Sequence, residues 1–393
     1  MEKIRYGVIG LGNQGSCYVY EIFDKDRDPN GIVTAACDID PKKIETMKEK
    51  TKNKDIAYFT DYTELLDSGL CDAVLVETPH YLHPVIVSAA LERGIHAISD
   101  KPAGVYAKQV REMNELAEKS EAKFGMMFNQ RTNCIYRKMH EMVQSGELGE
   151  IQRVTWIITN WFRPEAYYRS GGWRATWDGE GGGVLINQCP HQLDLLQWIV
   201  GELPVSVNGF CKYGRWHDIE VEDEVTAYFE YKNGATGVFI TSTGEAPGTN
   251  RLAISGTKGK LICENDVLTF WRNTPDNRTV CLTTPKPFDF PEYENVPVET
   301  DGKNEQHAGI VANFSAFLLG LEEQFVPGVE GIKGVQLMNA IEYSGWHGGA
   351  RVACPVDEED YLRELNERRK TSRIKTNVVE TVADTSNTFG GVK

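Results

Sequence analysis

The sequence lacks any long run of apolar residues. A membrane-spanning helix needs about 20 of them in a row, and no stretch of this chain comes near that length. The N-terminus also lacks a signal-peptide pattern, because residues 1–6 lead directly into a short apolar segment. We therefore expect a cytoplasmic protein without a membrane partner.

Closely spaced cysteines are missing as well. The nine cysteines form an odd-numbered set that is scattered from Cys17 to Cys354 without a close pair. A disulfide framework or a zinc site needs paired or clustered cysteines. The spacing therefore indicates reduced thiols, as in a cytoplasmic protein, and we predict no bound metal.

Positive charge is in short supply. The 42 Lys and Arg residues are outnumbered by 57 Asp and Glu residues, which gives a formal net charge of -15. Such a balance argues against nucleic acid and against anionic membrane surfaces as partners. It does not restrict a neutral small-molecule substrate.

The chain does have enough length for more than one domain. It contains 393 residues, of which 41% are hydrophobic and 25% are charged. That composition is ordinary for a globular protein, and a single core rarely grows to this size. We therefore expect two domains.

A glycine-rich turn follows the first apolar segment. Residues 6–9 are strand-like, Gly10-Leu11-Gly12-Asn13-Gln14-Gly15 comes next, and residues 18–23 are helix-like. Between a strand and a helix, the G-x-G-x-x-G pattern is typical of a dinucleotide-binding turn. The first two glycines let the backbone approach a pyrophosphate, and the third lets the helix pack on the strand.

A carboxylate ends the second predicted strand. Residues 32–37 are strand-like and lead to Asp38, which follows Gly15 by 23 residues. A carboxylate at this place binds the ribose hydroxyls of adenosine and repels a 2′-phosphate, so NAD is favoured over NADP. The alternative is that Asp38 caps a helix that begins near Pro41.

Strands and helices go on alternating up to residue 128. This alternation predicts a doubly wound parallel sheet, or Rossmann domain, which binds its ligand at the carboxyl ends of the strands. The residues that follow the later strands are Thr78-Pro79-His80, Asp100-Lys101-Pro102 and Asn129-Gln130-Arg131. Lys101 is of most interest, because the proline after it restricts its backbone. A single lysine is nevertheless more often a solvated surface residue.

From residue 151 the chain becomes rich in strands. Strand-like segments joined by turns such as Asn233-Gly234 predict a C-terminal α+β domain with a large, mostly antiparallel open sheet. We place the NAD-binding domain at residues 1–128 and a substrate-binding and oligomerisation domain at 129–356. Residues 357–393 are then a C-terminal helix and a polar, loosely held tail.

Three glycines lead into the segment with the most reactive side chains. Gly181-Gly182-Gly183 precede an apolar, helix-like stretch that carries Asn187 and His191 four residues apart. On one helix this spacing places both side chains on the same face. An amide and an imidazole there can hold a hydroxyl and remove its proton. The alternative is an ordinary glycine turn with a partly buried, hydrogen-bonded His191.

Together these motifs resemble the family of glucose–fructose oxidoreductases and inositol dehydrogenases (Gfo/Idh/MocA). The resemblance covers residues 4–355 and is carried by Gly10 to Gly15, Asp38, Thr78-Pro79-His80 with His83, Asp100-Lys101-Pro102, Arg131, and Gly182-Gly183 through Asn187, His191 and Asp194. It implies a homo-oligomer (dimer, tetramer or hexamer) built through the open sheet. It also implies that a secondary alcohol of a sugar or cyclitol is oxidised or reduced with a tightly held nicotinamide.

The predicted site consists of three overlapping groups of residues. The catalytic residues are Lys101, Asn187 and His191. The cofactor-binding residues are Gly10, Gly12, Asn13, Gln14, Gly15, Asp38, Thr78, Pro79, His80, His83, Asp100, Lys101, Asn129, Arg131, Trp173 and Arg174. The substrate-binding residues are Lys101, Tyr168, Trp173, Arg174, Asn187 and His191. The aromatic and arginine residues are included because rings stack on sugars and arginine offers fixed hydrogen bonds, although ordinary packing explains them equally well.

Two departures from the family pattern affect the expected mechanism. Asp100 stands where the family usually has glutamate, and Asn187 stands where inositol dehydrogenases usually have aspartate. Because an amide does not accept a proton, Lys101 and His191 remain as the titrating groups. We prefer His191 as the base, since its ordinary pKa is near neutrality. Lys101 takes that role if burial and nearby charge lower its pKa.

The asparagine form resembles the branch that oxidises pyranosides and glucosides at the 3-hydroxyl. We therefore predict an NAD-dependent sugar dehydrogenase that produces a keto sugar. The alternatives are an inositol or cyclitol dehydrogenase, an NAD-dependent glycosidase that works through transient oxidation, a reductase working in the opposite direction, and a non-catalytic NAD-binding regulator.

Overall fold

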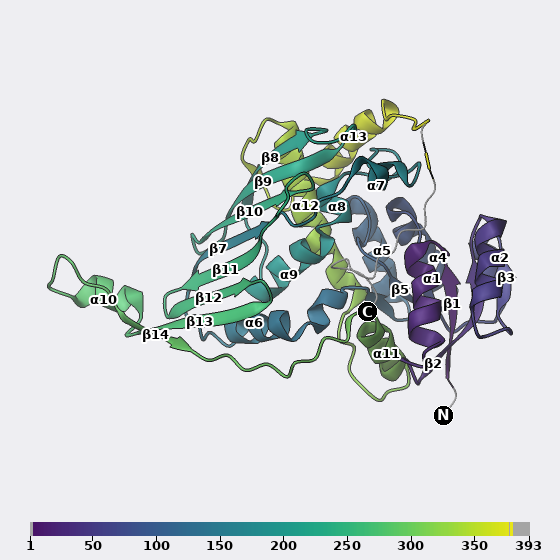
Figure 1. Cartoon of the computed structure of the whole chain (residues 1–393), viewed down its shortest axis with the longest axis horizontal. Helices are drawn as coiled ribbons and strands as arrows, with labels where there is room; N and C mark the ends of the chain where they lie inside the picture. Colours follow the sequence, from purple (N-terminus) through teal and green to yellow (C-terminus); the bar gives the residue numbers. More distant parts are fainter. Residues whose placement is uncertain (1–2, 377, 380–393) are drawn as a thin grey trace.

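The first of two sheets is the predicted Rossmann sheet. The computed structural model describes residues 3–376 and 378–379 (Figure 1). The first sheet is parallel throughout, with the strand order β3-β2-β1-β4-β5-β6. Its strands are β1 (Ile4–Ile9), β2 (Gly31–Cys37), β3 (Ala57–Phe59), β4 (Ala73–Val76), β5 (His96–Ser99) and β6 (Phe124–Met126). The direction of winding reverses between β1 and β4, and sheets of this kind bind ligands at that point, beyond the carboxyl ends of the strands.

Helices cover both faces of this sheet, which explains its apolar strands. All four residues of β4 are fully buried, as expected for a parallel strand between two helical layers. The surrounding helices are α1 (Asn13–Cys17), η1 (Tyr18–Phe23), α2 (Pro41–Lys50), α3 (Tyr62–Asp67), η2 (His80–Leu82), α4 (His83–Glu92) and α5 (Ala107–Lys119). The sequence analysis did not predict β3 or α3, and it raised a helix near Pro41, where α2 begins, only as an alternative. In α2 only Ile44 and Met47 are buried, so its apolar pattern is too sparse to recognise.

The second sheet has nine strands in the order β14-β13-β12-β11-β7-β10-β9-β8-β15. The strands are β7 (Ile151–Ile158), β8 (Ser206–Tyr213), β9 (Glu222–Glu230), β10 (Thr236–Ser242), β11 (Asn250–Gly256), β12 (Gly259–Glu264), β13 (Val267–Thr274), β14 (Glu292–Val296) and β15 (Val352–Ala353). The helices α6 (Cys134–Gln144), α9 (Pro190–Val200) and α12 (Gly331–Trp346) lie on one side of it (Figure 1). In β9, Val225, Ala227 and Phe229 point to that side and are fully buried.

One pairing in this sheet departs from the predicted hairpin order. β10 pairs in parallel with β7, with Phe239 opposite Trp156, whereas the other neighbours are antiparallel. The long connection that carries α7 (Glu165–Arg169), α8 (Val184–Asn187) and α9 separates β7 from β8. The hairpins β8–β9 and β9–β10 then bring β10 back beside β7.

The helix predicted after the glycines is in fact two helices. α8 ends at Asn187, and α9 begins at Pro190 after a break at Gln188 and Cys189. Proline has no N–H to donate and disfavours a helical conformation in the residue before it, so it fits the first position of a new helix. Asn187 and His191 therefore lie on consecutive short helices and not on one continuous face.

Two helices follow β14, α11 (Gln306–Leu318) and α12, with the short η4 (Gly328–Glu330) between them. α11 lies against the first sheet, where the Ser315 hydroxyl is 2.7 Å from the Tyr6 hydroxyl. A segment from the second half of the chain thus packs on the Rossmann half. The domain limits at residues 128 and 356 stay predictions.

The C-terminal region packs against the loop that precedes the glycines. After α13 (Glu358–Lys370), the Ser372 hydroxyl accepts a hydrogen bond from the Asp178 N–H at 3.1 Å, and Lys375 donates to the Tyr168 carbonyl at 2.7 Å. Residues 371–376 are therefore attached to the body, unlike the loose tail that we expected. Residues 377 and 380–393 of the predicted tail lie outside the described residues.

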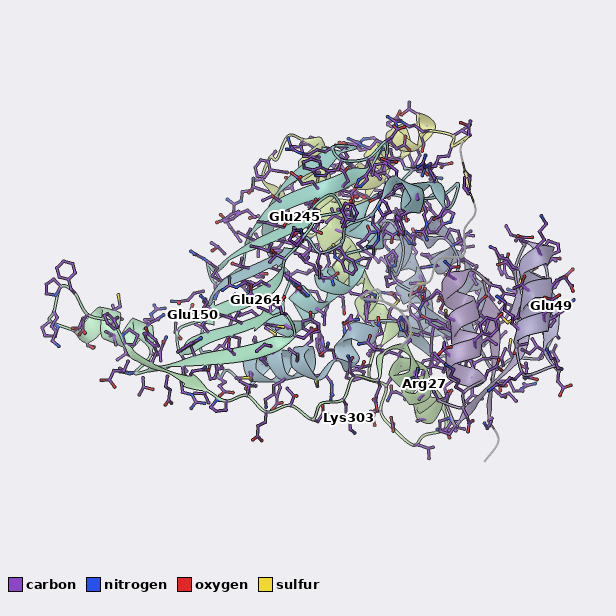
Figure 2. All side chains as sticks on the ribbon, viewed as in Figure 1. Arg27, Glu49, Glu150, Glu245, Glu264 and Lys303 are labelled. Atoms are coloured by element: carbon purple, nitrogen blue, oxygen red, sulfur yellow. The ribbon has the colours of Figure 1, made fainter. Side chains whose placement is uncertain are left out.

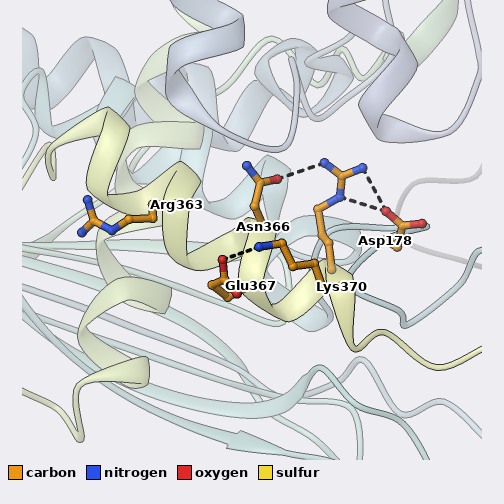
Figure 3. A pocket seen from close by; sticks show the side chains of 6 residues that line it. Asp178, Arg363, Asn366, Glu367 and Lys370 are labelled. Atoms are coloured by element: carbon orange, nitrogen blue, oxygen red, sulfur yellow. Dashed lines mark hydrogen bonds and ion pairs between the residues drawn. The ribbon is translucent and has the colours of Figure 1, made fainter.

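A shallow depression on α13 is formed by charged side chains (Figure 3). Arg369 contacts Asp178 at 2.9 Å and Lys370 contacts Glu367 at 2.6 Å. None of the predicted site residues lines this depression. Because its charges are paired with one another, it does not compete with the glycine-rich region as the candidate site.

Charged side chains stand on the outside of the molecule, such as Glu49 on α2 and Glu150 and Glu264 around the second sheet (Figure 2). All nine cysteines are free thiols, in agreement with the prediction. Among the described helices, none has both the length and the apolar character needed to cross a membrane. Within the described ranges, His, Cys, Asp and Glu form no cluster of three that is arranged to hold a metal ion.

Candidate active site

The three glycines of the first turn are needed for different structural reasons. Gly10 has φ +99°, and a Cβ there would lie 2.4 Å from the Glu77 carbonyl oxygen. A Cβ on Gly15 would lie 2.0 Å from the Gly10 carbonyl oxygen. Gly12 differs, because a Cβ there would meet no described atom within 4 Å. The fold itself thus requires Gly10 and Gly15, while Gly12 leaves open space above the turn for a ligand.

Asp38 lies beside this turn, where a dinucleotide's ribose is expected. The carboxylate is 7% exposed and accepts hydrogen bonds from the N–H groups of Leu11 at 2.7 Å and Asp40 at 2.9 Å. The cap of α2 is Asp40, whose side chain accepts from the Lys42 N–H. The alternative role of Asp38 as helix cap is therefore wrong. Its carboxylate connects the strand end to the glycine turn.

Several buried polar atoms near the carboxyl ends of the first sheet have no hydrogen-bond partner among the described residues. They are Gln14 Nε2, the Tyr18 hydroxyl, Thr78 Oγ1 and Asn129 Oδ1. A buried polar atom left without a partner costs about 1–3 kcal/mol, so native proteins rarely keep such a set without a use. A dinucleotide offers hydroxyl, phosphate and amide groups that match these donors and acceptors. The residues present therefore fit NAD.

Lys101 follows β5 and reaches across to the second half of the chain. Its ammonium donates a hydrogen bond to the Asn187 carbonyl at 2.7 Å. Burial lowers the pKa of Lys101, while the nearby carboxylates of Asp100 and Glu180 oppose the shift. The solvated surface lysine is therefore the wrong alternative. Lys101 joins the Rossmann half to the end of α8.

Two buried histidines face this lysine. His191 is 4% exposed, and its Nδ1 has no partner among the described residues. Burial, Lys101 and His307 all lower the pKa of His191 well below its ordinary value. His307, in the first turn of α11, has a pKa lowered to about 4, mainly by burial. The sequence analysis missed His307, because no local motif marks a histidine so far along the chain.

Asn187 is held by three side chains. Its Nδ2 donates to the Glu180 carboxylate, and its Oδ1 accepts from the Tyr167 hydroxyl at 3.1 Å and from Gln188 Nε2 at 3.2 Å. Arg174 donates to the Tyr167 hydroxyl at 2.9 Å. The sequence analysis did not select Tyr167 or Glu180. Glu180 directly precedes the glycines, and that position beside a predicted site was the available signal.

Comparison with known proteins identifies the family. Residues 4–128 match the oxidoreductase family with an NAD-binding Rossmann fold, and residues 136–262 match the GFO/IDH/MocA C-terminal domain. Together the two matches cover most of the chain. The chain belongs to the Gfo/Idh/MocA oxidoreductase family. The predicted NAD cofactor and the predicted fold class are confirmed.

Individual members of the family are distant relatives. A myo-inositol 2-dehydrogenase of Thermotoga maritima is 27% identical over 67% of this chain and 75% of its own length. The match to a putative oxidoreductase, YteT, of Bacillus subtilis covers 46% of that protein. The WlbA dehydrogenase of Bordetella pertussis, solved with NADH and UDP-GlcNAcA, shares the fold with a TM-score of 0.76 at 24% identity, covering 91% of this chain and 100% of that one. A levoglucosan dehydrogenase solved with NADH and levoglucosan aligns with a TM-score of 0.73 at 18% identity, covering 90% of this chain and all of that one.

In this oxidoreductase Arg131, predicted to contact the cofactor, is held in two ion pairs. Its guanidinium is 1% exposed and contacts the Asp194 carboxylate at 2.7 and 2.8 Å and the Glu330 carboxylate at 2.5 Å. These bonds join η3 (Asn129–Thr132), α9 and η4. Three guanidinium nitrogens of Arg131 are thus hydrogen-bonded to the two carboxylates.

Tyr168, predicted to contact the substrate, is buried and hydrogen-bonded to the second sheet. Its hydroxyl donates to Thr243 Oγ1 at 2.9 Å, and the side chain is 5% exposed. The ring therefore points into the second sheet. Adjacent residues on a short helix point in different directions, and Tyr167 is the one that faces Asn187.

His83 lies behind the predicted site. One ring nitrogen is 2.7 Å from the Thr78 carbonyl oxygen, and the other is 2.7 Å from the Pro102 carbonyl oxygen. His83 thus holds together the two loops that follow β4 and β5. The ring, predicted to contact the cofactor, supports the loops that carry Thr78 and Lys101.

The aromatic wall of the site is close to the predicted one. The ring of Trp173 lies edge-on to His80 at 5.5 Å, and the Arg174 guanidinium lies 4.7 Å from the Trp173 ring centroid. Asn129 Nδ2 donates to Gln306 Oε1 at 2.5 Å, which leaves its Oδ1 for a ligand.

The glycines before α8 are required by packing. A Cβ on Gly183 would lie 2.0 Å from the Glu222 carbonyl oxygen, and a Cβ on Gly182 would lie 2.7 Å from Glu342 Oε1. The Glu222 carboxylate also accepts the N–H groups of Gly183 and Leu185 at 2.9 and 3.0 Å. Gly183 therefore lets the start of α8 approach β9 closely, and Gly182 leaves room for the Glu342 side chain on α12.

Proposed function

We propose that the protein oxidises a secondary hydroxyl, at C3, of a sugar pyranoside or glucoside to a keto sugar with NAD⁺. The observation that carries this proposal is Asn187. Its main-chain carbonyl accepts a hydrogen bond from Lys101, and its side chain is an amide where inositol dehydrogenases usually have a carboxylate. That amide hydrogen-bonds to Tyr167 and Glu180. The wall formed by Tyr167, Trp173 and Arg174 offers rings and a guanidinium to a sugar. The WlbA dehydrogenase solved with UDP-GlcNAcA and the levoglucosan dehydrogenase solved with levoglucosan support the same class.

The side chains divide the chemistry among them. Bound NAD⁺ supplies the hydride acceptor, held by the glycine turn and Asp38. Lys101, with its lowered pKa, acts in its neutral amine form and takes the proton from the substrate hydroxyl. The Asn187 main-chain carbonyl accepts a hydrogen bond from the amine before the transfer and from the ammonium after it. His191 donates or accepts a hydrogen bond at the substrate oxygen in its neutral form. This assignment reverses the order expected from sequence, because burial makes His191 a weaker base than a free histidine.

A cyclitol dehydrogenase is the second candidate. The match to a myo-inositol 2-dehydrogenase is the observation that favours it, and the same Lys101 chemistry applies to a ring alcohol. A homo-oligomer built through the uncovered face of the second sheet and a cytoplasmic location complete the proposal.

The test is NADH formation on a panel of glucosides, free hexoses, nucleotide sugars and inositols, with NMR of each product. We expect NADH together with a 3-keto glucoside. If inositol alone were oxidised, the proposed substrate would be wrong, and the proposed mechanism would still apply. Release of free aglycone without net NADH would identify a glycosidase, and no turnover across the panel would favour a regulator.

A further inference from the structure

Glu180 is a buried acid with three partners in the candidate site. It is 2% exposed, and its carboxylate accepts a hydrogen bond from the Ala175 N–H at 2.5 Å and another from Asn187 Nδ2. The Arg174 guanidinium lies 3.9 Å away. A buried carboxylate is retained only when such partners stabilise it. Its hydrogen bond with Asn187 connects it to the residue whose main-chain carbonyl accepts from Lys101.

The charges around Glu180 come from several elements. The titratable groups that interact with it are Lys101 after β5, Arg174 in the same loop, Lys375 in the C-terminal segment, Tyr168 on α7 and Glu222 on β9. Burial raises the pKa of Glu180, while Arg174, the two N–H donors and Lys375 lower it. Burial lowers the pKa of Lys101; Asp100 and then Glu180 raise it, Arg174 lowers it and Cys189 raises it. Glu180 and Lys101 are therefore electrostatically linked.

We propose that Glu180 is the positioning residue that orients the Asn187 amide and supplies the negative charge opposite Lys101 when Lys101 takes the substrate proton. The inference rests on the proposed role of Lys101 as base. In that step the O–H bond of the substrate breaks, the proton adds to the lone pair of Lys101 Nζ, and Glu180 stays ionised throughout. An ammonium that forms in a buried site needs such a countercharge.

This arrangement explains why an amide at position 187 is compatible with catalysis. A carboxylate seven residues earlier provides the charge that aspartate at 187 would provide. The bond from Asn187 Nδ2 to Glu180 also fixes the amide, so that Oδ1 faces Tyr167 and Gln188. Aspartate at 187 would instead place two carboxylates side by side, which is unfavourable.

The first experiment compares the pH profiles of kcat/KM for the wild-type enzyme and Glu180→Gln. Because removing the carboxylate lowers the pKa of Lys101, the ascending limb should move to lower pH by about one unit. Glu180→Asp keeps the charge and should keep the limb in place even if turnover falls. Glu220→Gln is the matched control, because Glu220 accepts the Trp177 N–H of the same loop at 2.8 Å without contacting Asn187.

A second readout needs no substrate. The full-length protein is treated at different pH values with a trace of an amine-reactive reagent, and the modification of Lys101 is measured by mass spectrometry. Its pH dependence reports the protonation of Lys101 directly. The midpoint should fall in Glu180→Gln and stay in Glu180→Asp and Glu220→Gln. An unchanged midpoint in Glu180→Gln would overturn the inference. If the midpoint moves but no substrate on the panel is oxidised, the proposed function fails and the electrostatic link stands.

A third experiment moves the carboxylate from position 180 to position 187. Asn187→Asp alone should lower kcat/KM, because it adds a second carboxylate. The double variant Glu180→Gln with Asn187→Asp restores one carboxylate beside Lys101, and it should return the ascending limb toward its wild-type position. A double variant whose limb stays with that of Glu180→Gln would show that Glu180 acts only on the shape of the loop.

Discussion

At the scale of single residues, burial is the reason for proposing Lys101 and not His191 as the base. His191 and Lys101 both lie in the candidate site, and burial shifts both toward their neutral forms. For a histidine this removes basicity that it needs, whereas for a lysine it brings the pKa closer to the working range. Sequence reasoning used ordinary pKa values and therefore preferred the histidine.

This difference leads to a prediction about two variants. Lys101→Met should lower turnover by about 10²–10⁴-fold, the usual contribution of a general base, with nearly unchanged NAD affinity. His191→Asn keeps a hydrogen-bonding group and should cost only about tenfold, the value of one hydrogen bond. Steady-state kinetics and titration of NADH fluorescence measure both quantities.

Lys108→Met serves as the control for loss of a lysine. Lys108 lies on α5 and contacts Glu359 at 2.6 Å, so its replacement should leave turnover unchanged. If His191→Asn proved as damaging as Lys101→Met while Lys108→Met stayed active, the histidine would be the base after all.

At the scale of elements, Arg131 shows how a motif residue serves the fold. It joins η3, α9 and η4 through Asp194 and Glu330. Replacing Arg131 by Met leaves the Asp194 carboxylate buried without its main partner. Breaking such a pair typically costs about 3–5 kcal/mol, so the free energy of unfolding in urea should fall by that amount at unchanged NAD affinity.

The double variant Arg131→Met with Asp194→Leu is the matching control. It removes both charges together, and replacement of a whole buried pair by apolar groups is often neutral. Much of the lost stability should therefore return. A single variant that is stable but has lost NAD affinity would restore the predicted cofactor contact of Arg131.

Elements also show how far sequence patterns reach. The parallel sheet and the strand ends were predictable, because alternation and glycine spacing are local signals. The break between α8 and α9 also has a local signal, Pro190, but a strong apolar pattern on both sides concealed it. The parallel pairing of β7 with β10, the ion pairs of Arg131 and the approach of His307 depend on contacts between distant segments. Residue propensity and hydrophobic periodicity describe only local sequence, so they do not predict such contacts.

The site shows the same division between local and distant information. Gly10, Gly12, Gly15, Asp38, Lys101 and Asn187 stand at positions that strand order and motif spacing define. Tyr167 and Tyr168 are neighbours in sequence, and only the packing of Tyr168 against Thr243 decides which of the two faces Asn187. Glu180 becomes part of the site through its burial, which the sequence does not reveal.

At the scale of the whole molecule, the second sheet has one face covered by helices and one face without them (Figure 1). Trp271 and Tyr293 lie on the uncovered side, 37 and 63% exposed, with their rings 5.9 Å apart. In the segment between α10 (Asn277–Thr283) and β14, Phe288 and Phe290 are 94 and 75% exposed. Exposed aromatic groups of this kind mark surfaces that associate.

We therefore expect copies of this chain to associate through the uncovered face. Analytical ultracentrifugation at micromolar concentration should find an oligomer of the wild-type protein, and Trp271→Asp should shift it toward the monomer, because a charge buried in an interface without a partner is costly. Val85→Asp is the matched control, since Val85 lies on α4 of the Rossmann half and is 42% exposed. Its oligomer should persist. A monomeric wild-type protein would remove the expectation, and equal dissociation of both variants would show that added charge, and not the sheet face, governs assembly.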